Sequence, residues 1–216
     1  MEMFGDLLLI RKGTAALTMG GDATRLAPAA DRQEWESKAT ALRELFHRTL
    51  GTAPAGDCPL DLHIESEHAT EGYRRREVSY NLKHGERVTS TLLIPDNLTT
   101  PRPGILAIHQ TTPFGREQVL GSDPSEIGQK QQAYARDLVR LGFVVFAYDI
   151  VSANSRCGQN LKAFDTAEFY RRHPDWSARG CDLADAARAI DVMEHFPDLV
   201  DRERIGAIGH SQGGGI

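Results

Sequence analysis

Three short segments of the chain are apolar at nearly every position, and they limit the folds open to it. They are Gly104–Ile108, Phe143–Tyr148 and Arg204–Ile208. Successive side chains of a β-strand point to opposite faces of a sheet, so an uninterrupted apolar strand needs cover on both faces. Such cover is typical of parallel sheets flanked by helices. We therefore expect these three segments to be buried central strands.

Two helical patterns separate the three segments. Residues 129–141 place Tyr134, Leu138 and Leu141 on one side and end at Gly142, a residue suited to a helix C-terminus. Residues 177–195 repeat apolar side chains at helical spacing, namely Leu183, Ala186, Ala187, Ile190 and Met193. The resulting order is β-α-β-α-β, which predicts an α/β sheet.

Alternating polar and apolar residues precede this unit and predict antiparallel strands. The apolar positions are Leu62 and Ile64, then Val78, Tyr80 and Leu82, then Val88, Leu92 and Ile94. Residues 83–86 join the last two strands in a hairpin. We interpret residues 74–76, three consecutive arginines, as part of a solvated edge strand, because charge on an edge prevents further pairing. The predicted fold class is α/β, a mainly parallel sheet with antiparallel N-terminal edge strands and flanking helices.

The sequence divides into three parts. Residues 1–30 lack a sustained period and predict a mobile N-terminal arm. Residues 31–60 hold an amphipathic helix, which starts at a capping box of Asp31 and Glu34, followed by a linker. Residues 61–216 form the α/β domain.

Composition excludes several classes of partner. The 25 basic and 30 acidic residues leave a net charge of -5, so no basic face is available for nucleic acid. The longest early apolar run, residues 7–10, is too short for a signal peptide, and no membrane-spanning stretch follows. The sequence predicts a cytoplasmic protein and leaves its oligomeric state open.

The cysteines and histidines do not predict a metal site. Three cysteines without CxxC spacing suggest neither a disulfide framework nor a zinc site, and they favour a reducing compartment. We interpret His63, His68 and His84 as scattered surface histidines. No metal and no cofactor is expected.

The last apolar segment runs into a G-x-S-x-G pattern, Gly209-His210-Ser211-Gln212-Gly213. The pattern stands where a strand turns sharply into a helix, the setting that exposes a nucleophilic serine. Side chains two positions either side of the serine would collide with the neighbouring strand and helix, which explains the two glycines. Ser211 is the predicted catalytic nucleophile. A merely tight glycine-rich turn is the alternative.

A second candidate feature follows the first apolar segment, where α/β sheets place their sites. We predict that Thr111 and Gln212 contribute backbone N–H groups to an oxyanion hole, so that their side chains are replaceable. The predicted supporting residues are His109, Gln110, Gly209, His210 and Gly213. His109 is expected to fix its loop by hydrogen bonds rather than to transfer protons.

Together these segments resemble α/β-hydrolases of the dienelactone hydrolase and acetyl xylan esterase type. The resemblance covers about residues 73–216 and includes the Gly115-Arg116-Glu117 stretch. The chain departs from the family at Gln110, where a glycine commonly follows the histidine. It also has serine in place of the cysteine nucleophile of dienelactone hydrolase itself. The resemblance implies an enzyme that acts on a small-molecule ester.

The order of the triad has a consequence for this chain. In α/β-hydrolases the acid and the histidine follow the serine, and five residues follow Ser211 here. We therefore expect the acid and base beyond Ile216, and residues 1–216 alone to be poorly soluble and without triad-level activity. Asp149 is interpreted as structural rather than as a substitute acid.

Three functions remain open. The first is a serine hydrolase of carboxylic esters. The second is an amide or peptide hydrolase of the prolyl oligopeptidase-like type, because the glycines after the serine occur there too. The third is a non-catalytic, truncated or degenerate hydrolase. The aromatic residues of segment 150–176 are expected either to line a pocket or to pack locally.

Overall fold

The computed structural model describes residues 28–126, 128–158 and 162–216. It divides into two compact units, Met1–Thr49 and Leu50–Ile216. The predicted arm lies almost entirely outside the described residues. In the first unit, helix α1 (Arg32–Leu50) starts as its sequence predicts, because the Asp31 carboxylate accepts a hydrogen bond from the Glu34 backbone N–H at 2.8 Å.

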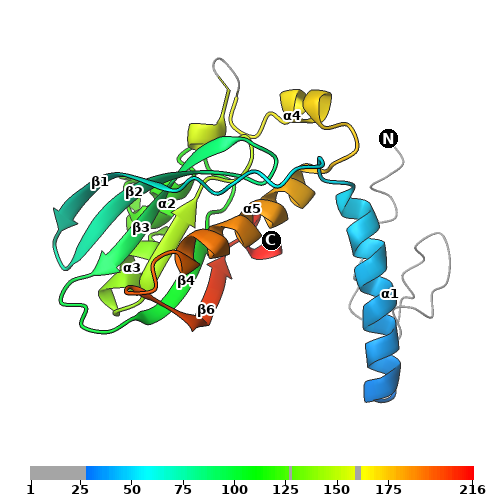
Figure 1. Cartoon of the computed structure of the whole chain (residues 1–216), viewed down its shortest axis with the longest axis horizontal. Helices are drawn as coiled ribbons and strands as arrows, with labels where there is room; N and C mark the ends of the chain where they lie inside the picture. The colour runs from blue at the N-terminus through cyan, green and yellow to red at the C-terminus, as the bar shows by residue number, and fades with distance from the viewer. Residues whose placement is uncertain (1–27, 127, 159–161) are drawn as a thin grey trace. The chain divides into compact units, whose positions relative to one another are not determined.

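The second unit is built on a mixed sheet (Figure 1). Six strands of the described residues line up in the order β1-β2-β3-β5-β4-β6. Their bounds are β1 (His63–Thr70), β2 (Tyr73–Asn81), β3 (Arg87–Pro95), β4 (Arg102–Ile108), β5 (Val144–Tyr148) and β6 (Val200–Gly209). Strands β1, β2 and β3 are antiparallel, and β4 pairs in parallel with both β5 and β6. The predicted fold class, including the antiparallel strands before the parallel unit, is confirmed.

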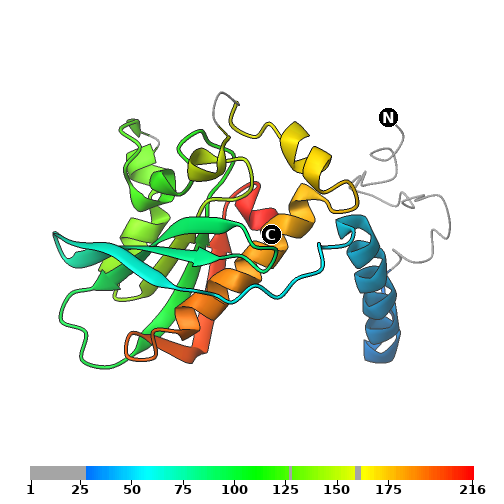
Figure 2. The same ribbon diagram turned by 45° about the horizontal axis from the view of Figure 1, so that its top comes forward.

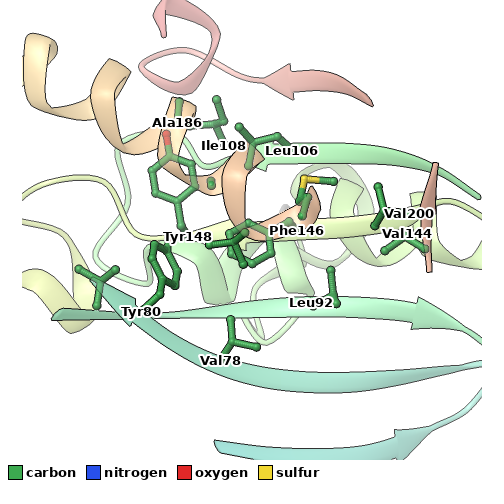
Figure 3. Close-up of a cluster of buried hydrophobic side chains, with 14 of the residues drawn as sticks. Val78, Tyr80, Leu92, Leu106, Ile108, Val144, Phe146, Tyr148, Ala186 and Val200 are labelled. Carbon is green, nitrogen blue, oxygen red and sulfur yellow. The ribbon is translucent and has the colours of Figure 1, made fainter. Parts of the chain in front are cut away.

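Helices cover both faces of this sheet, as the apolar strands require (Figure 2). On one face α5 (Ala178–Glu194) packs on a cluster that includes Leu92, Leu106 and Phe146. Figure 3 shows these side chains together with Ala186 of α5. On the other face α2 (Arg116–Leu120) and α3 (Tyr134–Arg140) cover a second cluster. Strand β5 is fully buried between the two layers.

Two strands differ from their predicted exposure. Strand β6 pairs on one side with β4, and in the described chain it is the last strand of the sheet, so Ile208 is 40% exposed rather than buried. Residues 74–76 do not form an edge, because β1 pairs with β2 along its length. Their arginines are satisfied by carboxylates instead: Arg75 binds Glu77 and Glu117.

The helices also differ in detail from the periodic patterns. The segment predicted as one helix at 129–141 is a π-helix, η2 (Gly128–Gln132), followed by α3. Two short helices, α2 and α4 (Ala167–Arg172), were not predicted. Helix α5 has its predicted bounds, and the Ser177 hydroxyl caps it by accepting from the Gly180 N–H.

The buried face of α5 is only partly the apolar one that the sequence predicts: Ala186 and Met193 are buried, but charged residues are buried beside them. Ile190 is 37% exposed, whereas Asp182, Asp185 and Arg188 are buried. Each buried charge has a partner, which makes its burial tolerable. Asp182 accepts from the Val151 backbone N–H at 2.9 Å. Arg188 donates to backbone carbonyl oxygens. Because these buried residues are charged, the hydrophobic period alone does not predict their burial.

Arg156 is the centre of a buried group of charges that includes Asp185 of α5. Its guanidinium binds the Asp185 carboxylate at 2.5 Å and the Glu86 carboxylate at 2.9 Å. It thereby ties the β2–β3 hairpin and the loop after β5 to α5. Burial alone would raise the pKa of Glu86, but a hydrogen bond with His84 and the charge of Arg156 bring that pKa down to about 2.

A pH titration of stability tests this ion pair. The folded state keeps Glu86 ionised to a lower pH than the unfolded state does, so its contribution is complete above the ordinary pKa of 4.5 and is lost as the pH falls towards about 2. We expect Glu86→Gln to lower the free energy of unfolding at pH 7, and the gap to wild type to narrow below pH 4.5. Urea unfolding at a series of pH values measures it. A gap that stays constant across this range would contradict the assignment.

Candidate active site

Ser211 occupies a strained turn directly after β6. Its φ of +52° lies in the left-handed region, which a residue with a side chain adopts only at some cost. The chain then enters a 3₁₀ turn, η4 (Gly213–Gly215). The Ser211 side chain is therefore exposed at the tip of a sharp strand-to-helix turn, in the conformation that the G-x-S-x-G pattern predicts.

The two glycines of the pattern are needed for close backbone contacts. A Cβ atom on Gly209 would overlap the backbone of Gly213, on the far side of the turn. A Cβ atom on Gly213 would overlap the carbonyl oxygen of Ile108 and come within 2.7 Å of that of His109. The serine turn is therefore packed directly against the end of β4.

A second turn lies beside the serine turn. Because Ile108 of β4 pairs with Gly209 of β6, the two chains leave the sheet from one rung of the ladder. Three residues later the Thr111 hydroxyl donates a hydrogen bond to the side-chain oxygen of Gln212 at 2.8 Å. Neither the Thr111 nor the Gln212 backbone N–H donates to another group of the described residues. The structure therefore brings together Ser211 and the two predicted oxyanion donors.

His109 is buried and both of its ring nitrogens are occupied. Nδ1 donates to the Gln110 carbonyl at 2.7 Å, and Nε2 accepts from the Ile150 backbone N–H at 3.2 Å. Burial lowers its pKa, and the hydrogen bond that Nε2 accepts fixes the neutral ring. In this arrangement the ring joins the loops after β4 and β5 and has no free nitrogen for proton transfer.

Gln110, where the resembling family commonly has glycine, belongs to a buried row of side-chain amides. Its Nε2 donates to Gln118, whose own Nε2 donates to the Asp123 carboxylate at 2.7 Å. The Gln110 Oε1 has no partner among the described residues. This row fastens the turn to the start of α2.

Asp149 holds the same region from the other side. Its Oδ1 accepts from the Arg116 backbone N–H at 2.7 Å, and its Oδ2 binds the Arg116 guanidinium and the Ser155 hydroxyl. A Cβ atom on Gly115 would overlap Asp149, so the glycine is required. With its oxygens occupied in this way, Asp149 has the geometry of a structural carboxylate, as interpreted from its place in the sequence.

Two groups support the turn less directly: the His210 backbone carbonyl, which accepts from the Gly213 N–H at 3.0 Å, and the Tyr134 hydroxyl. The His210 side chain is exposed next to the serine. The Tyr134 hydroxyl donates to the Ile108 carbonyl oxygen at 2.5 Å, and burial raises its pKa to about 12. The structure adds two residues to the predicted set: Arg179, which donates to the Gln212 carbonyl at 3.1 Å, and Gln118, which accepts from Gln110. No sequence pattern marks either residue.

No histidine or carboxylate of the described residues forms a hydrogen bond with the Ser211 hydroxyl. The arrangement among the described residues is therefore an exposed serine hydroxyl near two backbone N–H groups that have no partner there. Among all the described residues, no helix is long and apolar enough to cross a membrane.

One cluster of the described residues has ligand types suited to a metal: His84, Cys181 and Asp185, with ligand atoms within 4.8 Å of one another. The sequence predicts His84 to be a surface histidine, and this prediction is wrong. Its side chain is 8% exposed and packs against Trp176. The Arg156 guanidinium already supplies the positive charge that Asp185 requires, and burial raises the pKa of the Cys181 thiol. These residues therefore fit an ion-pair network better than a metal centre.

A cavity of about 380 Å³ adjoins this network. Its walls come from the β2–β3 hairpin, the loop after β5 and the α4 region. Phe169 lines it and also belongs to a small buried cluster with Val151, Trp176 and Cys181. Segment 150–176 therefore both lines a pocket and packs locally, while Tyr170 remains exposed.

Comparison with solved structures identifies the architecture as the α/β-hydrolase fold. A Bacteroides fragilis protein assigned as an acetyl xylan esterase is 21% identical, with a TM-score of 0.66 over 84% of this chain and 48% of that one. The glucuronoyl esterase of Solibacter usitatus is 18% identical, with a TM-score of 0.58 over 86% of this chain and 55% of that one.

A CE15 glucuronoyl esterase from Teredinibacter turnerae is also similar, at 20% identity and a TM-score of 0.57, over 84% of this chain and 47% of that one. The chain thus spans about half the length of the solved structures it matches. No family model and no curated protein sequence matches it. At these identities the likeness establishes the fold.

The glycine contacts give a test of the turn. We expect Gly213→Ala to lower the free energy of unfolding by about 1 to 3 kcal/mol, because the added methyl group overlaps backbone atoms that cannot rotate away. Gly206→Ala is the matched control, since a Cβ atom there would have its nearest neighbour at 3.5 Å, an ordinary contact. Urea unfolding of both variants measures the difference. Equal stabilities would mean that the turn is not packed against β4 as described.

Proposed function

We propose that the protein is a serine hydrolase of carboxylic esters. The observation that carries this proposal is Ser211, held at φ +52° on the turn after β6 beside two backbone N–H groups without partners in the described residues. A nucleophile and two donors that converge at the carboxyl ends of parallel strands are the requirements of acyl transfer. The fold and its esterase neighbours support the same chemistry.

The proposed reaction has two steps. Ser211 Oγ attacks the acyl carbon and gives up its proton to a histidine base, while the carbonyl oxygen takes negative charge and accepts from the N–H groups of Thr111 and Gln212. The alcohol leaves with a proton from that base, and water then hydrolyses the acyl-enzyme by the same route. In the chain order of the fold, the acidic residue and the histidine both come after the serine.

The neighbouring structures suggest a class of substrate. They are described as acetyl xylan and glucuronoyl esterases, enzymes named for esters of carbohydrates. We propose a small-molecule ester as the substrate here, with the reacting carbonyl at the exposed Ser211 hydroxyl.

Labelling with a fluorophosphonate probe tests the nucleophile. We expect the natural-length protein to be labelled at Ser211 and to hydrolyse p-nitrophenyl acetate, and Ser211→Ala to lose both properties, because the attacking oxygen is gone. Circular dichroism checks that the variant is folded. Labelling of both proteins to the same extent would contradict the proposal. Turnover of a p-nitroanilide in place of the ester would support the amide hydrolase instead.

A proline at position 111 tests the oxyanion donor. Thr111→Pro removes the backbone N–H, and we expect kcat to fall by roughly a hundredfold or more, the usual loss for one such donor. Thr112→Pro, one position further along the same turn, controls for the effect of proline itself. Near-normal kcat in a folded Thr111→Pro protein would assign the second donor to another residue.

A further inference from the structure

The side chains of the two proposed oxyanion donors bond to each other. The Thr111 hydroxyl lies 2.8 Å from Gln212 Oε1, across the gap between the turns that follow β4 and β6. From the sequence alone both side chains are replaceable, because only their backbone N–H groups are assigned a role. The hydrogen bond shows that the two side chains also connect the turns that carry these N–H groups.

The contact closes a loop that begins in the sheet. Ile108 and Gly209 form one rung of the β4–β6 ladder, and Gly213 packs against the backbone of Ile108 and His109. The bond between Thr111 and Gln212 joins the same two chains again at their exposed end. The two turns are thus held together at both ends, which limits how far apart their N–H groups can move.

Gln212 is held at two of its atoms. Its backbone carbonyl accepts from Arg179 at 3.1 Å, and its side-chain oxygen accepts from Thr111. The Gln212 N–H shares its peptide plane with the Ser211 carbonyl, which accepts from the Gly214 N–H at 3.1 Å. This bond and the two bonds of Gln212 leave the residue little freedom to rotate, so the direction of its N–H is set. The Arg179 guanidinium is itself held 4.0 Å from the buried carboxylate of Asp182.

We propose that Thr111 and Gln212 are positioning residues: their side-chain hydrogen bond fixes the spacing and direction of the two oxyanion N–H groups before substrate binds. This inference rests on the proposed function and adds to it a role for the side chains. Donors that are already in place need no reorganisation when the oxyanion forms, and this preorganisation acts on the transition state more than on the bound substrate.

A comparison of kcat and KM among Thr111 variants tests the proposal, on the protein that includes its acid and histidine. Thr111→Val keeps the shape of the side chain and removes the hydroxyl, whereas Thr111→Ser restores a hydroxyl. We expect Thr111→Val to lower kcat about fivefold with KM nearly unchanged, the size of effect typical of one hydrogen bond, and Thr111→Ser to retain most of the activity. Thr70→Val, at the exposed end of β1, is the matched control.

A double-mutant cycle adds specificity. Gln212→Met keeps the length of the side chain without its amide. If the two side chains act through one bond, Thr111→Val combined with Gln212→Met is no worse than the more damaging single variant. Strictly additive losses would overturn the proposal, as would full activity of Thr111→Val in a protein whose turnover depends on Ser211.

A second readout does not depend on turnover. In the ¹⁵N-labelled protein with its acid and histidine present, the Gln212 backbone amide should have an order parameter near 0.85, typical of rigid backbone, in wild type and Thr111→Ser. We expect a lower value in Thr111→Val. If all three proteins give the same value, the hydrogen bond does not hold the Gln212 N–H. If wild type shows no Ser211-dependent turnover, the proposed function is overturned. The order parameters then decide the inference on their own.

Discussion

The site depends on how the ends of β4, β5 and β6 are tied together, and the buried Asp149 carboxylate is central to that. It binds the Arg116 backbone and guanidinium at the start of α2, which ends the loop after β4, and Ser155 from the loop after β5. A charge that is 1% exposed is tolerable only with partners of this kind, so the two loops cannot separate without leaving it unpaired. His109 joins the same loops by a neutral hydrogen bond.

Backbone packing then fixes the turn that carries Ser211 against the end of β4. Gly213 lies against the carbonyl oxygens of Ile108 and His109, which only a residue without a side chain allows. The left-handed Ser211 is therefore supported by the end of β4 rather than by contacts of its own side chain. Strain at a functional residue persists where the surrounding structure leaves no alternative, and the glycine contacts supply that condition here.

Buried polar groups explain most differences between the predictions and the structure. The apolar period of residues 177–195 predicts the helix and the burial of Ala186 and Met193. It does not predict the burial of Asp182, Asp185 and Arg188, because their partners lie on other elements. Charge on residues 74–76 likewise predicts an edge strand, but β1 pairs with this strand. Glu67 binds two of its arginines, and Glu77 and Glu117 bind the third, Arg75. Partners that are distant in sequence leave no local signal.

The sequence by itself determined the strands and the position of the serine. Uninterrupted apolar runs specify strands covered on both faces, and the glycines around Ser211 specify a turn that no larger residue permits. Only the tertiary structure decided that β5 lies between β3 and β4, that β6 ends the described sheet, and that Thr111 meets Gln212. The physical reason is range: periodicity and turn chemistry act over a few residues, whereas a contact between positions 111 and 212 exists only after the strands have paired.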